Sequence, residues 1–197
     1  MSIYGRRGVA PLRSGLIPGG YYTLGEGVII ASAAVAAADR LMLYMFDVEE
    51  ATPVAALFAR VAIAGAGSAM KAGIWRNVAS RPTGLPIIAD NVGMSCAATG
   101  PIEAAVAGII PRGRWWAGAK CSATLPTMIA WHGSAIRQPS LAGAATATAA
   151  INNGATNQAG AYHLDGQTFA NDLPDLTGAA ILPGATGCPV LGVKVAA

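Results

Sequence analysis

The sequence predicts an all-β protein, an antiparallel β-sandwich of the jelly-roll type with an extended N-terminal arm. Segments in which apolar residues alternate recur at spacings of about ten to fifteen residues. Turn signals rich in glycine, proline and serine separate these segments, and no stretch has a convincing amphipathic-helix period. Short strands with turns between them are typical of sandwiches and barrels.

A chain of 197 residues suits one domain, with or without appendages. A domain of this size buries roughly 70% of its unfolded surface, so it needs no disulfides for stability. The apolar share is 53%, but much of it is alanine, which predicts a thin, close-packed core. The cysteines, Cys96, Cys121 and Cys188, lack metal-site spacing and are expected to be buried in a protein made in a reducing compartment.

Charge and hydropathy argue against nucleic acid and membrane as partners. The net charge of +3 is too weak for a nucleic-acid-binding face. The best membrane candidate, Val28–Phe46, contains Asp39 and Arg40, and each costs about 2.5–3.5 kcal/mol near a bilayer centre. The N-terminus also lacks the apolar block of a secretion signal. We therefore expect no bound nucleic acid and no membrane insertion.

Residues 1–26 are predicted to form the N-terminal attachment arm. Glycine, proline and arginine are mixed with single apolar residues, without a helical or strand period. Such a segment has no core of its own, so it is either a frayed terminus or a segment ordered on another subunit. The side chains expected at a subunit interface are Tyr4, Arg6, Arg7, Leu12, Leu16, Ile17, Tyr21 and Tyr22.

The sandwich is predicted to span residues 27–197. The alanine run at 31–38 has high helix propensity, whereas residues 40–48 are rich in residues that favour strands. Both faces of that second segment are apolar, which predicts a central or covered strand, preceded by a short strand or loop.

A hairpin is expected next. Period-two alternation predicts strands over 54–63 and 70–75, and GAGSA at 65–69 forms the turn between them. Residues 77–85 have the composition of a loop. Further strands are expected around Ile87 and Ile88 and over residues 102–110.

The segment 111–131 predicts a turn, a strand, a polar loop and a second short strand. Trp115 and Trp116 are adjacent, so they point to opposite faces of the first of these strands. We expect this to be the last long strand of the sandwich, closing the core. One tryptophan would then anchor the core while the other meets a neighbour or solvent.

From residue 132 the composition becomes small, polar and rich in glycine. This predicts a long excursion at about 132–188 that carries few core residues and is functional or held by a partner. Residues 189–195 read as a final strand that pairs back into the sheet.

The residue patterns predict no catalytic site, no metal site and no cofactor. His132 and His163 lack metal-ligand spacing, and the acidic residues after residue 164 do not follow a calcium-loop pattern. No nucleophile elbow or dinucleotide-binding loop is present in the sequence. If the sandwich binds a glycan, the expected contacts are Trp75 and the outward member of the pair Trp115–Trp116.

Several stretches together resemble a group of small β-sandwich structural proteins of tailed bacteriophages. The stretches are RLMLYMF at 40–46, GSAMKAGIW at 67–75, IIPRGRWWAGAK at 109–120, and LPDLTG at 173–178 followed by PVLGVKV at 189–195. Gly113, Trp115 and Trp116 stand where that group has a glycine and an aromatic pair, although Arg114 lies between them. Leu173 and Pro174 match a late leucine–proline loop. The resemblance covers about residues 27–197, and its motifs are structural.

The resemblance implies a non-enzymatic component of a phage or phage-like virion, such as a tail, fibre or head-decoration protein. It would be assembled in the host cytoplasm, dock through its arm onto other virion structural proteins, and form a homo-oligomer. The alternative is a module of the same particle that binds a host-surface glycan or receptor. A hydrolase would need two carboxylates about 5–9.5 Å apart, and the sequence shows no convincing pair.

Overall fold

The computed structural model describes residues 15–25, 29–34, 38–131, 161–183 and 188–197. Within these ranges the chain forms strands, turns and irregular segments, without a helix. The strands are β1 (Tyr21–Thr23), β2 (Ile29–Ala34), β3 (Leu41–Val48), β4 (Thr52–Ile63), β5 (Ala69–Val78), β6 (Arg81–Ser95), β7 (Gly100–Ile110), β8 (Gly113–Cys121), β9 (Thr127–Trp131), β10 (Ala161–Leu164), β11 (Leu182–Pro183), β12 (Cys188–Pro189) and β13 (Gly192–Val195).

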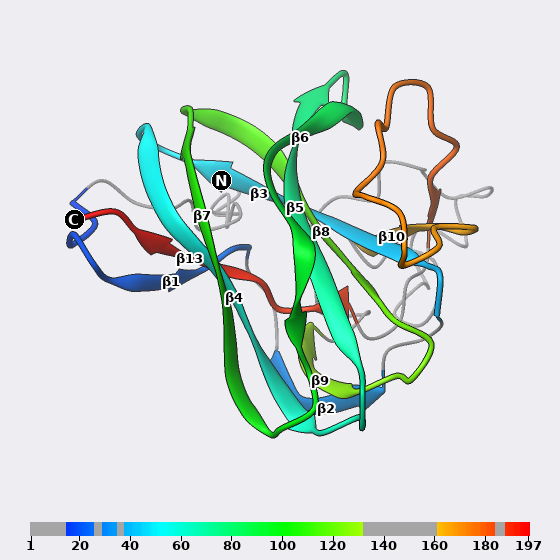
Figure 1. Ribbon diagram of the computed structural model, residues 1–197. Coiled ribbons are helices and arrows are strands. Elements are labelled where there is room, and N and C mark those ends of the chain that lie inside the picture. The colour runs from blue at the N-terminus through cyan, green and yellow to red at the C-terminus, as the bar shows by residue number, and fades with distance from the viewer. Residues whose placement is uncertain (1–14, 26–28, 35–37, 132–160, 184–187) are drawn as a thin grey trace, which may run out of the picture.

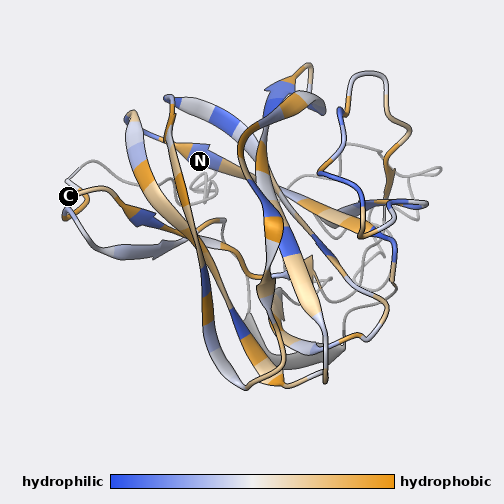
Figure 2. Cartoon of the chain, viewed as in Figure 1, coloured by the Kyte–Doolittle hydropathy of each residue, from blue (hydrophilic) through white to orange (hydrophobic). Residues whose placement is uncertain are grey.

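The strands form two antiparallel sheets that pack face to face (Figure 1). The six-stranded sheet has the order β11-β10-β3-β8-β5-β6. The seven-stranded sheet has the order β1-β13-β4-β9-β12, with β2 also paired to β9 and β7 also paired to β4. Along the long strands, hydrophobic and hydrophilic positions follow one another (Figure 2), as expected where one face is buried.

The strands from β2 to β9 are connected as a jelly roll. They divide into β3-β8-β5-β6 in one sheet and β2-β9-β4-β7 in the other. The chain changes sheet at every connection in this series except the one from β5 to β6. This arrangement confirms the predicted all-β sandwich and its jelly-roll character. Of the remaining strands, β10 and β11 extend the six-stranded sheet beyond β3, while β13 pairs with β4 and β1, and β12 pairs with β9.

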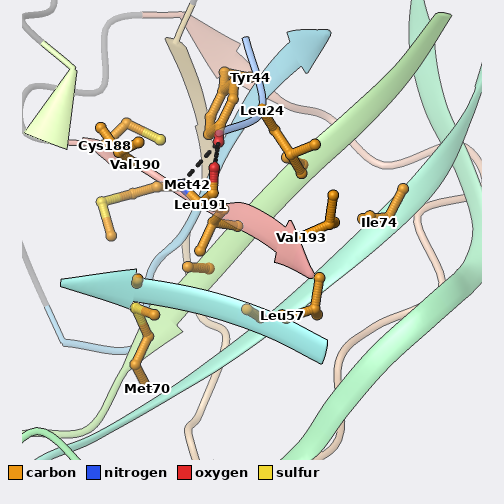
Figure 3. Close-up of a cluster of buried hydrophobic side chains, with 14 of the residues drawn as sticks. Leu24, Met42, Tyr44, Leu57, Met70, Ile74, Cys188, Val190, Leu191 and Val193 are labelled. Carbon is orange, nitrogen blue, oxygen red and sulfur yellow. Dashed lines mark hydrogen bonds between the residues drawn. The ribbon is translucent and has the colours of Figure 1, made fainter. Parts of the chain in front are cut away.

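The main core lies between the two sheets (Figure 3). Tyr44 of β3 projects into it, and its hydroxyl oxygen accepts a hydrogen bond from the Leu191 amide at 3.0 Å. The same hydroxyl is 3.4 Å from the Leu191 carbonyl oxygen. A buried tyrosine hydroxyl requires polar partners, and here they tie the end of the chain to β3.

A second core lies on the outer face of the six-stranded sheet. Its fully or nearly fully buried members are Leu41, Leu43, Met45, Trp75, Trp116, Tyr162, Leu173 and Leu176. The cover over these strand residues is the segment 161–183, which is orange to red-orange in Figure 1. The prediction that the strand at 40–48 is central or covered is therefore confirmed: β3 pairs with both β8 and β10 and is buried on both faces.

The predicted hairpin between the strands at 54–63 and 70–75 is wrong. Both strands exist, but β4 and β5 belong to different sheets, and the GAGSA turn crosses from one layer to the other. Leu57 and Ile74 both face the shared core, so the two strands stack instead of pairing. Period-two alternation identifies an inward face and does not choose between these two arrangements.

The hairpin that does form joins β5 to β6, where residues 77–85 were predicted to be a loop. Val78 pairs with Arg81, and only Ala79 and Ser80 lie between them. Both have positive φ, 48° and 64°, as a two-residue type I′ turn requires. Alanine and serine are not the residues that signal such a turn, which explains the error.

The predicted arm of residues 1–26 is too long, because residues 15–25 belong to the sandwich. β1 pairs with β13, and the Leu24 side chain has no exposed surface. The prediction that the first two dozen residues have nothing to bury against is therefore wrong for this part. Residues 1–14 lie outside the described ranges.

The predicted excursion also contributes more to the core than expected. Tyr162, Leu173 and Leu176 are buried on the six-stranded sheet, so the expectation of few core residues is wrong for 161–183. Residues 132–160 and 184–187 lie outside the described ranges. The final strand is confirmed, since β13 pairs with β4 and β1. No helix long and apolar enough to cross a membrane occurs in the described ranges.

Candidate functional site

Polar side chains from several strands gather at one end of the sandwich. β3 and β5 end there and β8 begins there, because β8 pairs antiparallel with both, and β7 ends there just before β8 begins. Strand pairing sets Arg76 opposite Trp115 and Asp47 opposite Arg114. The chain enters the sandwich at the same end, where Gly19 donates to the Val195 carbonyl.

Two adjoining hollows are present at this end. The first, the arginine groove, has a volume of about 470 Å³ and is lined by Arg76, Asn77, Val78, Pro111, Arg112, Gly113, Arg114 and Trp115. The second, the acidic recess, has a volume of about 720 Å³ and is lined by Asp47, Val48, Glu49, Glu50, Asn77, Arg112, Gly113 and Arg114. The two hollows therefore share a wall but differ in charge.

Arg114 is held in a bidentate ion pair with Asp47. Its Nε donates to Oδ1 at 2.8 Å and its Nη2 donates to Oδ2 at 3.0 Å. Hydrogen bonding to this carboxylate raises the pKa of Arg114, which stays charged. The pair is partly exposed and adds little stability, but its fork geometry fixes the guanidinium between the two hollows.

The indole N–H groups of Trp115 and Trp116 hold two of the residues that line the groove, Pro111 and Asn77. The Trp116 indole N–H donates to Asn77 Oδ1 at 2.9 Å, so the Asn77 amino group is left as the donor available elsewhere. The Trp115 indole N–H donates to the Pro111 carbonyl at 2.8 Å and fixes the turn that carries Arg112. Gly113 follows with φ of 138°, a conformation that favours glycine.

The tryptophans expected to meet solvent or a glycan are buried instead. Trp75 and Trp116 have no exposed surface, and Trp115 exposes 8%. Trp75 also donates its indole N–H to the Pro174 carbonyl at 3.0 Å. Trp75 and the outward member of the pair therefore lack the exposed surface on which the glycan hypothesis depended, because residues 161–183 cover that face. The strand that carries the pair is central, between β3 and β5.

The predicted interface residues fall into two groups. Tyr4, Arg6, Arg7 and Leu12 lie outside the described ranges. Of the others, Leu16 and Tyr22 pack partly against the main core, whereas Ile17 and Tyr21 are exposed at 68% and 52%. Their role at a subunit interface stays a prediction.

A second polar arrangement, which the sequence reasoning missed, holds the segment that covers the six-stranded sheet. Lys120 is completely buried, and its Nζ donates to the carbonyls of Thr168, Asn171 and Asp172 at 2.9–3.0 Å. Lys71, its partner in the strand register, donates to the Asn171 carbonyl at 3.0 Å. Burial, and then the neighbouring Lys71, lower the pKa of Lys120. The only signal in the sequence was a lysine that follows a run of apolar residues in β8.

The described cysteines and the described potential metal ligands show no reactive arrangement. Burial raises the pKa of the Cys96 thiol to about 11 and also raises the pKa values of Cys121 and Cys188, which disfavours the reactive thiolate. In these ranges no three His, Cys, Asp or Glu side chains are grouped to hold a metal ion.

The fold and the site define a jelly-roll β-sandwich with a polar, charge-divided hollow at one end. No protein-family model matches this chain, and no curated protein matches its sequence.

Proposed function

We propose that this protein is a non-enzymatic structural component of a phage or phage-like particle, of the tail, fibre or head-decoration type. The observation that carries the proposal is where the phage-like motifs lie. RLMLYMF supplies β3, the two tryptophan motifs supply β5 and β8, and LPDLTG supplies the cover over them. Stretches far apart in the sequence thus form one packing unit, which supports a role for these motifs in the scaffold.

The segment proposed for attachment is shorter than the predicted arm of residues 1–26. Residues 15–25 are part of the sandwich, so docking onto other virion proteins would fall to residues 1–14, with Tyr4, Arg6, Arg7 and Leu12 as anchors. The proposal includes a homo-oligomer and location in the virion after assembly in the host cytoplasm.

The test uses particles released from cells that carry this sequence. After density-gradient separation, mass spectrometry of the particle fractions should detect the protein, and a variant lacking residues 1–14 should fold normally but be lost from those fractions. The matched control is Val92→Ser, at a position 91% exposed on β6, which should still be incorporated. Detection of the full chain only in fractions free of particles would overturn the proposal.

A further inference from the structure

We propose that the arginine groove and the acidic recess together bind an acidic saccharide, a sugar of one or a few rings that carries a carboxylate. The inference goes beyond the proposed particle role and does not depend on it. It begins from the unequal distribution of charge between the two hollows. Three arginines and no carboxylate line the groove, whereas three carboxylates line the recess together with two of those arginines, Arg112 and Arg114.

The groove offers the donors that a carboxylate requires. Arg76 and Arg112 are exposed, and neither guanidinium forms an ion pair with another described residue. Planar guanidinium groups bind carboxylates through two parallel hydrogen bonds. The amino group of Asn77 adds a neutral donor on the wall that both hollows share.

The recess is lined by carboxylate oxygens, each of which can accept more than one hydrogen bond from sugar hydroxyls. Asp47, Glu49 and Glu50 line it beside the same Asn77 and Arg114. Each sugar hydroxyl both donates and accepts, so a surface divided between donors and acceptors suits it. A polyanion such as nucleic acid would instead meet like charge in the recess, which raises its binding free energy.

The hollows are open, and their volumes are sufficient for a ligand of one or a few sugar rings. Volumes of about 470 and 720 Å³ fall within the range of about 300–1,000 Å³ that is usual for small-molecule sites. The indole bonds to Asn77 and Pro111 and the Arg114–Asp47 pair hold the walls before a ligand arrives. Such preorganisation reduces the entropy lost on binding.

Isothermal titration calorimetry tests the site with four probes: a galacturonic acid disaccharide, a sialyl-lactose, neutral lactose and inorganic phosphate. At least one of the two acidic sugars should bind, and lactose and phosphate should bind at least tenfold more weakly. Arg76→Ala should weaken binding of the acidic sugar at least tenfold. Arg60→Ala, which removes an exposed arginine from β4 outside both hollows, should leave it unchanged.

Asn77→Asp is the sharper variant. An aspartate can still accept the Trp116 indole hydrogen bond, so the fold is kept, but the neutral donor becomes a negative charge. Binding of the acidic sugar should fall at least tenfold while the thermal unfolding midpoint changes little.

Three results would each overturn the proposal: no binding of either acidic sugar, equal binding of phosphate, or binding that survives both Arg76→Ala and Asn77→Asp. A short polyglutamate peptide that binds as tightly as the sugars would also overturn it and would identify a docking surface for an acidic protein segment. None of these results bears on particle incorporation, so the two proposals can fail separately.

Discussion

The two outer faces of the sandwich differ in what lies on them. On the six-stranded sheet, Leu43, Trp75 and Trp116 point outward and are covered by residues 161–183. On the seven-stranded sheet, alternate residues of β7 are exposed, among them Glu103 and Ala105. The size of the outward side chains therefore separates a face that needs a cover from one that can meet water.

The exposed face is organised by a small polar and aromatic group. The Tyr21 hydroxyl donates to Glu103 at 2.9 Å, and the Lys194 ammonium lies 5.1 Å from the Tyr21 ring centroid. Phe58 meets the Tyr21 ring edge-on, and it occupies the space that a side chain at position 192 would need. These contacts join side chains of four strands of the same sheet, β1, β13, β4 and β7, and need no covering segment.

The largest expected effect would come from emptying the covered face. Trp75→Ala should lower the free energy of unfolding by about 3–5 kcal/mol, because it leaves a cavity under the cover and removes the bond to Pro174. Urea unfolding measures the change. The matched variant on the exposed face, Ile109→Ala, should change it by about 0.5 kcal/mol or less. Similar losses for both variants would contradict the comparison.

A smaller loss is expected from releasing the cover at its polar end. Lys120→Met removes the donor to three backbone carbonyls and should destabilise the protein by about 3 kcal/mol, since three hydrogen bonds from a charged donor are lost at about 1 kcal/mol each. Lys71→Met removes one such bond and should lose about 1 kcal/mol. Limited proteolysis should show earlier cleavage within residues 165–176 in the first variant. Equal resistance in the two variants would count against a clamping role for Lys120.

Cys96, in the core between the two sheets, should make the free energy of unfolding decrease at alkaline pH. Burial raises the pKa of Cys96 from 9.0 to about 11, so the unfolded chain loses this proton first as pH rises. The stabilising contribution is complete below about pH 9 and is lost as pH rises towards about 11. Denaturant midpoints measured across this window should fall, and Cys96→Ala should make the fall shallower. A midpoint that rises in the wild type and is unchanged by the substitution would show that another group controls this window.

The smallest expected effect concerns the turn between β5 and β6 in the covered, six-stranded sheet. Replacing Ala79 and Ser80 by asparagine and glycine suits the positive φ values of that turn and should stabilise the protein by about 0.5–1 kcal/mol. Thermal unfolding measures the gain. The same replacement at Ala97 and Ala98, two exposed residues between β6 and β7, should give no comparable gain. A loss at the hairpin would mean that the present side chains make contacts the replacements cannot.

Much of the candidate site was beyond prediction from the sequence. Arg112 and Arg114 are neighbours in one turn, but Arg76 belongs to a separate segment, and only the register between β5 and β8 brings it to the same groove. The adjacent tryptophans were visible, but their indole bonds to Asn77 and Pro111 were not. Side-chain alternation describes one strand at a time, whereas a site of this kind is made by neighbours in the sheet.

The sequence alone determined that the chain is all-β, that its strands pack as a sandwich, and that β3 is buried on both faces. These features follow from local periodicity, because successive side chains of a strand point to opposite faces, so the sequence shows which face is apolar. Only the tertiary structure decided which strands pair, where the true hairpin lies, and that residues 15–25 and 161–183 complete the two cores. Those choices depend on long-range packing, in which a strand stacked on a partner and a strand paired with it bury the same apolar face.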